Sequence, residues 1–505
     1  MSRLFLAGVA VSLVFHVIAL PVEAAVFEVD RFDDPFPSQN CASGVDVDCS
    51  LREAVITANN TAGPDLIIIP AGTFNLTRSG TPENASVSGD LDLAEAVRIE
   101  GAGMTATIID GGGPGVLNDR IIDILGVEVE IEGLTIRGGS GVTNGGGLYN
   151  RSGSTLTLTE TMITANQADT VAGWAGGMQT AGICTLIFSV VHDNEASRAG
   201  GIDASGTTII QDSWISDNRA LEASSDWSGG GILTFQSGSS TTLIRTTVSG
   251  NTSASYGGGL HAYGPTTIVD STFESNHSAK FGGAISVAPS RTVTIEKSAF
   301  FWNTSDADGG AIGVEDLGTL DITNSTIDSN HAGKEGGAIA VEGVASLINV
   351  TIGRNTAITA TAVINSPTSN VTYHNTIFEG SCSSAVQVTS LGGNIESPGN
   401  TCQLTARSDQ FNVTSMALDL GPLGYFGGST ATRLPLPGSV AIDAADGCPT
   451  SFEDQRGTTR PIDGDGIGGA ICDVGSVEVL LNEEPWLFED GFETGDTFGW
   501  SSTVP

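Results

Sequence analysis

Aromatic side chains recur at one corner of a repeated sequence, and their spacing suits the binding of sugars. In two repeats the segment before a Gly-Gly pair is lengthened and carries a tryptophan. The next two repeats carry Tyr or Phe at almost the same place, with acidic and basic residues close by. Aromatic rings can stack on the apolar faces of sugar rings. The predicted binding residues are Trp174, Trp227, Tyr256, Phe281, Asp226 and Arg198. The alternative is a hydrophobic stack that only covers the corner.

Two pairs of aspartates are candidates for catalysis and metal binding. Asp193 and Asp217 each precede the same asparagine of consecutive repeats, so stacked repeats would place their carboxyls about 5 Å apart. Such carboxyls can share a proton, hold calcium or act in acid/base catalysis; the alternative is two exposed turn residues that diverge into water. Asp463 and Asp465 alternate with glycines as in part of a calcium loop, where the alternative is a plain tight turn. No other cofactor is expected.

Motifs of familiar polysaccharide-cleaving and hydrolytic enzymes are missing from the sequence. It contains neither the Arg-x-Pro-x-x-Arg motif typical of pectate lyases nor the Asn-Thr-Asp and Gly-His-Gly motifs typical of polygalacturonases. Gly-x-Ser-x-Gly and His-Glu-x-x-His are missing as well. We therefore favour a non-catalytic, adhesin-like protein that binds polysaccharide or a surface partner. The alternatives are a polysaccharide lyase or glycoside hydrolase with an unfamiliar site, and a purely structural surface protein.

The elements that must position these residues repeat along most of the chain. The pattern I/L-x-x-S/T-x-F/I/V-x-x-N ends at asparagines spaced 24 to 33 residues apart, namely Asn166, Asn194, Asn218, Asn251, Asn276, Asn303, Asn330 and Asn355. Short alternating stretches of Thr, Val and Ile within each period predict strands. A period of about 27 residues fits one coil of three short strands. The predicted fold is an all-β parallel β-helix of about ten or more coils, with the asparagines stacked as a ladder.

The two ends of this solenoid carry signals of their own. Ser50 and Glu53 have capping-box spacing and precede apolar residues with a helical period, so a helix should begin there and cover the first coil. Six of the seven cysteines form three close couples, and local pairing is the simplest proposal. The couples are Cys41 with Cys49, Cys382 with Cys402, and Cys448 with Cys472. Cys184 lies in an apolar run and is predicted to be a buried thiol.

The N-terminus and the charge indicate an exported protein. Arg3, an apolar run from Leu4 to Leu20 and small residues up to Ala25 form a secretory signal pattern. The formal net charge is −38, which disfavours nucleic acid and anionic membranes and suits calcium, neutral polysaccharide or solubility alone. We expect a monomer that is secreted or lies at the bacterial cell surface, without an integral membrane segment in the mature chain.

Segments at both ends resemble a known family. "CSLREA" at Cys49–Ala54 matches the motif that names the CSLREA-domain proteins. "AIDA", "DQRG", "RP" and "CDVGSVE", between Ala441 and Glu478, resemble the choice-of-anchor Q domain. The Gly-Gly-Ala-Ile and Phe-x-x-Asn repeats between them are similar to those of polymorphic outer-membrane proteins. The resemblance implies a right-handed, pectate-lyase-like parallel β-helix on an exported bacterial protein, and it brings no settled activity. "DGFETGDTFGW" at Asp490 resembles a C-terminal motif of exported bacterial proteins, either a sorting tag or a small terminal strand.

These signals divide the chain into five segments. They are a signal peptide (1–25), an N-terminal cap with the helix (26–65), parallel β-helix repeats (66–380), C-terminal coils with a disulfide-bearing, choice-of-anchor Q-like cap (381–480), and a linker with the tail motif (481–505).

Overall fold

The computed structural model describes residues 24–35, 41, 48–80, 83–224, 226–235, 238–384, 388–448 and 453–481. Most of the predicted signal peptide, residues 1–23, lies outside this range, and so do residues 482–505 of the predicted linker and tail motif. None of the helices in the described part is long and apolar enough to cross a membrane.

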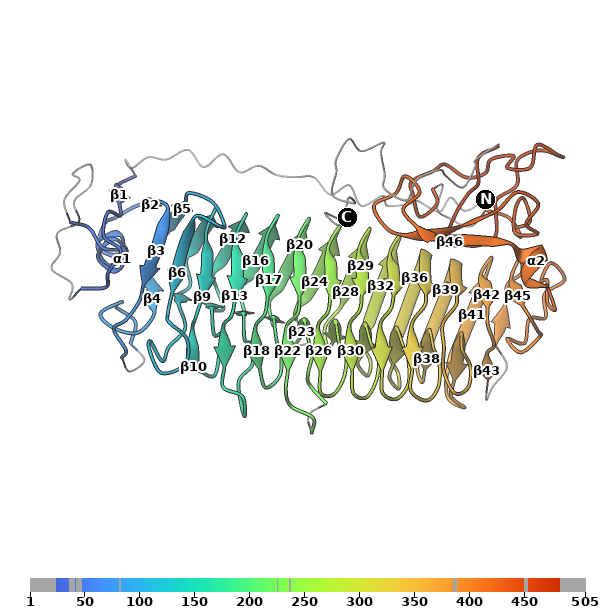
Figure 1. The fold of residues 1–505 in the computed structure, drawn as a ribbon, viewed down its shortest axis with the longest axis horizontal. Helices are drawn as coiled ribbons and strands as arrows, with labels where there is room; N and C mark the ends of the chain where they lie inside the picture. Colours follow the sequence, from blue (N-terminus) through green and yellow to red (C-terminus); the bar gives the residue numbers. More distant parts are fainter. Residues whose placement is uncertain are drawn as a thin grey trace, which may run out of the picture.

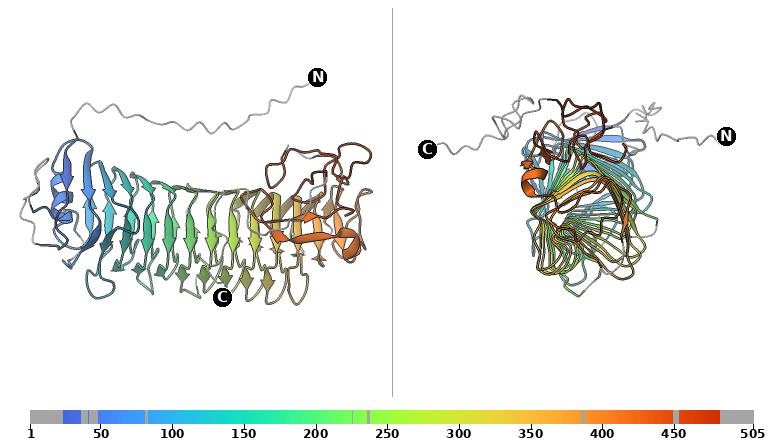
Figure 2. Two further views of the ribbon diagram at one scale, coloured as in Figure 1. Left: turned by 45° about the horizontal axis from the view of Figure 1, so that its top comes forward. Right: turned by 90° about the vertical axis from the view of Figure 1, so that its right-hand side faces the viewer.

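The described chain forms a right-handed parallel β-solenoid of about 11 turns (Figure 1), so the predicted fold class is confirmed. Three parallel sheets run along it, with 25, 8 and 12 strands, which we call the large sheet, the short-strand sheet and the twelve-stranded sheet. Seen along the axis, successive coils superimpose around one interior (Figure 2). Alternate strand residues fill that interior: Leu156 and Leu158 are fully buried, whereas the threonines between and beside them are partly exposed.

The strands of the three sheets have the following bounds. The twelve-stranded sheet contains β4 (Leu91–Leu93), β7 (Ile122–Ile124), β11 (Leu148–Asn150), β15 (Met178–Thr180), β19 (Ile202–Ala204), β23 (Ile232–Thr234), β27 (Leu260–Ala262), β31 (Ile285–Val287), β35 (Ile312–Val314), β38 (Ile339–Val341), β40 (Val363–Asn365) and β43 (Ser383–Ser384). The short-strand sheet contains β10 (Ser140–Val142), β14 (Gln167–Ala168), β18 (Glu195–Ala196), β22 (Arg219–Ala220), β26 (Thr252–Ser253), β30 (His277–Ser278), β34 (Thr304–Ser305) and β37 (His331–Ala332). The large sheet contains β1 (Val26–Glu28), β2 (Asp65–Ile69), β3 (Gly72–Asn75), β5 (Val97–Gly101), β6 (Thr107–Asp110), β8 (Glu128–Glu132), β9 (Thr135–Arg137), β12 (Thr155–Thr159), β13 (Met162–Thr164), β16 (Ile183–Ile187), β17 (Val190–His192), β20 (Thr207–Gln211), β21 (Trp214–Ser216), β24 (Ser240–Ile244), β25 (Thr247–Ser249), β28 (Thr266–Val269), β29 (Thr272–Glu274), β32 (Thr292–Glu296), β33 (Ala299–Phe301), β36 (Thr319–Asp328), β39 (Val344–Gly353), β41 (Asn370–His374), β42 (Ile377–Glu379), β44 (Thr389–Ser390) and β45 (Ile395–Ser397).

The predicted asparagine ladder is present at one corner of the solenoid. Oδ1 of Asn218 accepts the backbone N–H of Asn194 at 3.1 Å and its Nδ2 at 3.0 Å, and the same two bonds recur from coil to coil. A second ladder, of Ser and Thr hydroxyls, lies at the previous corner, where Ser298 Oγ accepts the N–H of Ser271 at 3.2 Å. Both ladders satisfy backbone donors that the corners would otherwise leave buried and unpaired.

The predicted helix α1 (Leu51–Asn59) closes the first coil. Ser50 caps it, and the reciprocal bonds with Glu53 of a capping box are both present. Its apolar face, including Leu51 and Val55, belongs to the core of the solenoid. The first strand of the described chain is β1, which precedes the helix and pairs with β2 in the large sheet.

Beyond α2 (Ser415–Leu418) the chain turns back along the outside of the large sheet (Figures 1 and 2). It forms the antiparallel strands β46 (Leu420–Gly424) and β47 (Thr432–Pro435). Thr326 and Thr351 of the solenoid hydrogen-bond to a buried hydroxyl and amide cluster in this returning segment, at distances of 2.6–3.1 Å. Residues 420–448 and 453–481 therefore brace the side of the solenoid.

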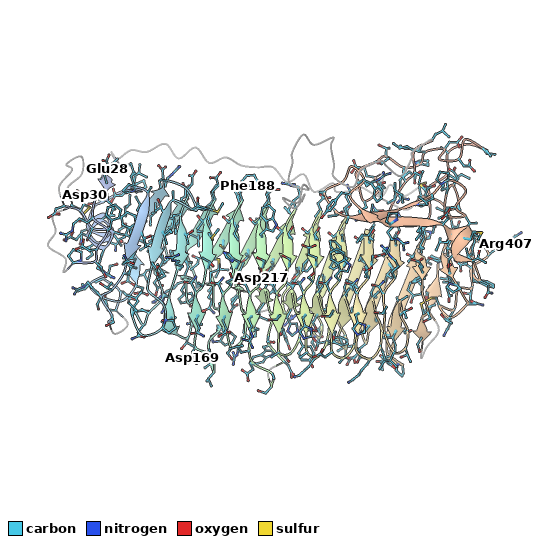
Figure 3. The ribbon with its side chains drawn as sticks, in the orientation of Figure 1. Glu28, Asp30, Asp169, Phe188, Asp217 and Arg407 are labelled. Atoms are coloured by element: carbon cyan, nitrogen blue, oxygen red, sulfur yellow. A yellow bond between two sulfur atoms is a disulfide. The ribbon has the colours of Figure 1, made fainter. Side chains whose placement is uncertain are left out.

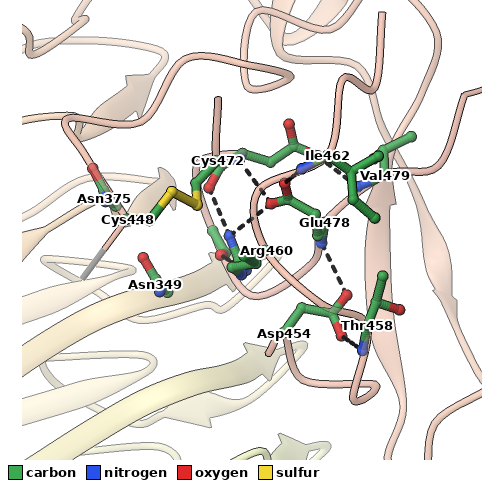
Figure 4. A network of polar contacts seen from close by, with 12 residues as sticks. Asn349, Asn375, Cys448, Asp454, Thr458, Arg460, Ile462, Cys472, Glu478 and Val479 are labelled. Carbon is green, nitrogen blue, oxygen red and sulfur yellow. Dashed lines mark hydrogen bonds and ion pairs between the residues drawn. A yellow bond between two sulfur atoms is a disulfide. The ribbon is translucent and has the colours of Figure 1, made fainter. Parts of the chain in front are cut away.

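The residues that resemble the choice-of-anchor Q domain build the interior of this segment (Figure 4). Arg460 donates to the carbonyl of Asp473 at 2.8 Å and to Glu478 at 3.2 Å, and Asp454 accepts the backbone N–H of Glu478 at 2.9 Å. The Cys448–Cys472 disulfide adjoins this network, and Cys41–Cys49 and Cys382–Cys402 are also bonded. The three bridges follow the local pairing proposed from the sequence.

Candidate functional site

The outer face of the twelve-stranded sheet gathers most of the predicted binding residues. In its three-residue strands the first and third residues are buried on the inner side, as Ile285 and Val287 are, while the second residue does not belong to the main hydrophobic core. Parallel pairing lines up these second residues as a central row. Around the middle of the solenoid the row consists of Gln179, Asp203, Leu233, His261 and Ser286.

Seven rings form a continuous path over this row, which we call the aromatic path. Consecutive ring centroids are 5.1, 5.5, 6.4, 4.7, 5.4 and 6.5 Å apart. These separations are those of tilted, edge-to-face and stacked aromatic contacts. In order, the rings belong to Trp174, Phe235, Trp227, Tyr263, His261, Tyr256 and Phe281.

The path arises because the sheet receives rings from both of its edges. Trp174 and Trp227 come from the two long loops that precede β15 and β23, whereas Phe235 and Tyr263 directly follow β23 and β27. Phe235 and Tyr263 pack on a small buried cluster of Ala175, Ala199 and Leu233. Sequence reasoning missed Phe235, Tyr263 and His261 because it followed only the corner before Gly-Gly. The sequence did carry a signal for them: Phe235 and Tyr263 come directly after strands, and His261 is the middle residue of one.

The rings differ in exposure. Trp227 is 41% exposed, whereas Phe281 is 8% exposed. Phe281 lies over Gly313, where a Cβ atom would come within 2.3 Å of its ring. The path therefore combines an open indole, which a ligand can reach, with rings that act as packing.

Two cations lie on the aromatic path. The guanidinium of Arg198 is 3.9 Å from the Trp174 centroid, and the Lys280 ammonium is 5.3 Å from that of Tyr256. Asp226 is exposed beside the path. Burial raises the pKa of Tyr263 to about 12, with further contributions from the negative charges of Glu315 and Asp226.

Carboxyl groups follow the aromatic path along the sheet. Glu315 accepts a hydrogen bond from Ser286 Oγ at 3.0 Å and lies 3.2 Å from His261 Nε2. Beyond Phe281, a pocket of about 300 Å³ is lined by three carboxyl groups, among other residues. They belong to Asp308, Glu335 and Glu342. Burial raises the pKa of Asp308 and of Glu342, so both favour the protonated, hydrogen-bond-donating form more than ordinary carboxyls do.

Asp203 lies in the central row beneath the aromatic path. It is fully buried, and burial raises its pKa to about 7 although Ser205 and Gln179 donate hydrogen bonds to its carboxylate. Asp203 is the middle residue of β19, between two apolar residues. Its carboxyl gives the floor of the site a polar group.

Asp193 and Asp217 lie elsewhere, at the corner between the large sheet and the short-strand sheet. Figure 3 labels Asp217. Both are exposed and hold left-handed backbone conformations, with φ of 53° and 54°. The carboxylate of Asp193 lies 2.9 Å from His192 Nδ1. These are features of turn residues, and neither aspartate adjoins the aromatic path.

The structure adds a third carboxyl to Asp463 and Asp465. Asp443 joins them, with ligand atoms of all three within 4.8 Å of one another. The Asp443 carboxylate already accepts the backbone N–H groups of Gly464 and Asp465, at 3.1 and 3.0 Å. It therefore orders the loop, and the group could also hold a cation. Asp443 escaped sequence reasoning because it lies 20 residues before Asp463.

A family model agrees with the fold over part of the chain, and several solved structures are distantly similar. The family model of the right handed beta helix region matches residues 221–357. Pectate lyase Pel9A is 13% identical, covering 90% of this chain and 98% of that one, with a TM-score of 0.39. The Agl-KA catalytic domain is 12% identical, with coverages of 75% and 69% and a TM-score of 0.43. A GH87 alpha-1,3-glucanase catalytic unit from Streptomyces thermodiastaticus is 13% identical, with coverages of 69% and 66% and a TM-score of 0.36. No curated protein matches the chain.

Proposed function

We propose that this chain is an exported protein that binds polysaccharide along the outer face of its twelve-stranded sheet. The observation that carries the proposal is the aromatic path, which is continuous across several coils and includes an open indole at Trp227. Aromatic faces bind the apolar faces of sugars, and the polar groups beside them can bond hydroxyl edges. The three disulfides support an oxidising, extracellular location.

The charge of the site favours a neutral glycan. Asp308, Glu335 and Glu342 line the pocket beside the aromatic path, and the whole chain carries a formal charge of −38. A polyanionic chain would be repelled by both. Neutral sugar hydroxyls, in contrast, can donate to carboxylates and accept from protonated carboxyls.

The test compares the glycan affinity of two double variants, one lacking two tryptophans of the aromatic path and the other lacking two tryptophans elsewhere. The W174A/W227A variant should bind neutral polysaccharide more than tenfold more weakly, since each stacking contact is worth about 1 kcal/mol. The matched control is W214A/W302A, because Trp214 and Trp302 are 54% and 58% exposed but lie on or next to strands of the large sheet. Equal affinity of the two double variants for every glycan tested would contradict the proposal.

A second candidate, glycoside hydrolysis, rests on the raised pKa values of Asp308 and Glu342 in one pocket. Glycosidases pair a protonated acid with a second carboxylate. If the pocket is catalytic, wild-type protein should release reducing ends from a neutral glycan, and D308N and E342Q should abolish the release without weakening binding. If it only binds, neither the wild type nor the variants should release any.

A further inference from the structure

A second group of carboxyls lies at the other end of the twelve-stranded sheet. Asp92 and Asp123 are the second residues of β4 and β7, so they continue the central row, and Asp90 directly precedes β4. Ligand oxygens of the three carboxyls all lie within 4.8 Å of one another. All three residues are at least 97% buried, with exposures of 3%, 0% and 1% for Asp90, Asp92 and Asp123.

The N-terminal helix holds the loop that carries this group. Arg52 of α1 is fully buried and donates to the carbonyls of Ser86, Gly89 and Asp90 at 3.1, 2.8 and 3.1 Å. A bidentate ion pair with Asp34 completes its bonding. The guanidinium thus fixes the loop before β4 without neutralising the three aspartates.

The charges near the group do not balance. Asp119 is a fourth buried carboxyl beside Asp90. Burial is the main cause that raises the pKa of Asp90, and the negative charge of Asp119 is the next. Two guanidiniums face the four carboxyls: Arg120 lies 3.0 Å from Asp90 and 3.4 Å from Asp123, and Arg151 lies 2.7 Å from Asp123. With every carboxyl ionised, negative charges outnumber positive ones by at least two around these buried aspartates, and Glu83 adds further negative charge near Asp92.

One oxygen of the group lacks a protein partner. Asp92 Oδ2 accepts the backbone N–H of Ser86 at 2.8 Å. Oδ1 of the same carboxylate is buried and has no hydrogen-bond partner among the described residues. A buried carboxylate oxygen without a partner is costly, so a ligand for it is expected.

We propose that Asp90, Asp92 and Asp123 bind a calcium ion. The three ligand oxygens all lie within 4.8 Å of one another. An ion at their centre would therefore lie within about 2.8 Å of each, close to the calcium–oxygen distance of about 2.3–2.6 Å. An all-carboxylate site without His or Cys suits a hard cation. The two positive charges of the ion would offset the excess negative charge, and Asp92 Oδ1, which has no hydrogen-bond partner among the described residues, can serve as a ligand.

Such an ion would join the first coils to the cap. Asp90 and Asp92 belong to one coil and Asp123 to the next, while Arg52 ties the same loop to α1. Calcium would therefore stabilise the N-terminal end against unfolding, because it binds the folded carboxyl group and not the separated ones.

Calcium binding is measured by calorimetry and by thermal unfolding of the full chain. Wild-type protein stripped with a chelator should gain several degrees in its first unfolding transition when calcium is added. D92N keeps an oxygen for the Ser86 N–H but should bind calcium at least tenfold more weakly and lose that gain. The control D321N alters an exposed aspartate on β36, which belongs to neither group of aspartates, and should behave like the wild type. A gain in D92N equal to that of the wild type, or no gain in the wild type, would overturn the assignment.

A second readout does not require an aspartate variant to fold. Tyr149 is the register partner of Asp123 on β11, and the guanidiniums of Arg120 and Arg151 lie 5.4 and 5.7 Å from its ring centroid. Terbium, a luminescent substitute for calcium, should be sensitised by this ring. Y149F should lose most of the tyrosine-sensitised emission while retaining calcium affinity. Unchanged emission in Y149F, or equal stabilisation by magnesium and calcium, would refute a calcium ion at this site.

Discussion

The guanidinium of Arg198 bridges two indoles: its central carbon is 3.9 Å from the ring centroid of Trp174 and 5.7 Å from that of Trp227. Arg198 belongs to the coil between those of the two tryptophans. A cation over aromatic faces is attracted by their quadrupoles. The contact therefore holds two enlarged loops together over the sheet, and it fixes the only strongly exposed ring of the aromatic path that the described residues contain.

Replacing Arg198 with Lys should loosen these loops. The flat guanidinium stacks on an indole, whereas an ammonium does not. We expect a loss of about 1 kcal/mol in unfolding free energy, a red-shifted tryptophan emission and weaker glycan binding. Arg219→Lys is the control, because its side chain is 64% exposed on β22. Identical emission spectra for R198K and R219K would contradict the role given to Arg198.

The stability of wild-type protein should fall relative to D203N as pH rises. Burial raises the pKa of Asp203 from 3.8 to about 7 in the folded protein. Between these values the folded state binds more protons than the unfolded state, so the contribution is full below about 4 and is lost as pH rises through about 7. D203N removes this dependence, and the unpartnered Gln179 Oε1 can accept from the new amide. The check is denaturant unfolding of both proteins at several pH values; parallel curves would contradict the prediction.

Cys184 should stay unreactive until the protein unfolds. It is fully buried, and burial raises its pKa to about 12, so it holds almost no thiolate at neutral pH. A thiol reagent should label no cysteine in native protein and one in denaturant. Non-reducing peptide mapping should recover the three disulfides, and a bridge to Cys184 would contradict the structure.

Asn251→Asp should destabilise the solenoid strongly. The Nδ2 of Asn251 donates to Ile215 O at 2.8 Å and to Asn276 Oδ1 at 3.0 Å. A carboxylate cannot donate, and it would place a charge in the ladder, so we expect a loss of about 3 kcal/mol or more. Asn370→Asp, at the exposed start of β41, is the control. Equal midpoints in urea for N251D and N370D would show that the ladder contributes little.

The sequence was sufficient for the parts of the fold that repeat. The Asn, Gly-Gly and alternating strand residues recur with one period, and each repeat carries the same local chemistry, so the coil and its ladder follow. The helix at Leu51 was predictable because Ser50 and Glu53 determine a capping box within four residues.

The candidate site was only partly predictable because it depends on contacts between coils. Trp174 and Trp227 stood out by loop length, but Phe235 and Tyr263 join them only when the two edges of a sheet are brought together. Asp90, Asp92 and Asp123 lie in one group across a gap of 31 residues, outside the regular repeat. The returning path of residues 420–448 and 453–481 was missed for the same reason: its partners, such as Thr326, carry no local sign of it.

The returning segment also has a mechanical consequence. Each coil of a solenoid contacts only its neighbours. When one end is pulled, the coils can therefore unfold one at a time, each at a low force. Here the segment contacts Asp270, Lys297, Asn324, Thr351 and Asn375, which lie on five successive coils. Tension applied at its end must therefore load these attachments together, in shear along the axis. The C-terminal half of the molecule should resist pulling as one block, whereas the coils before it should unwind in steps.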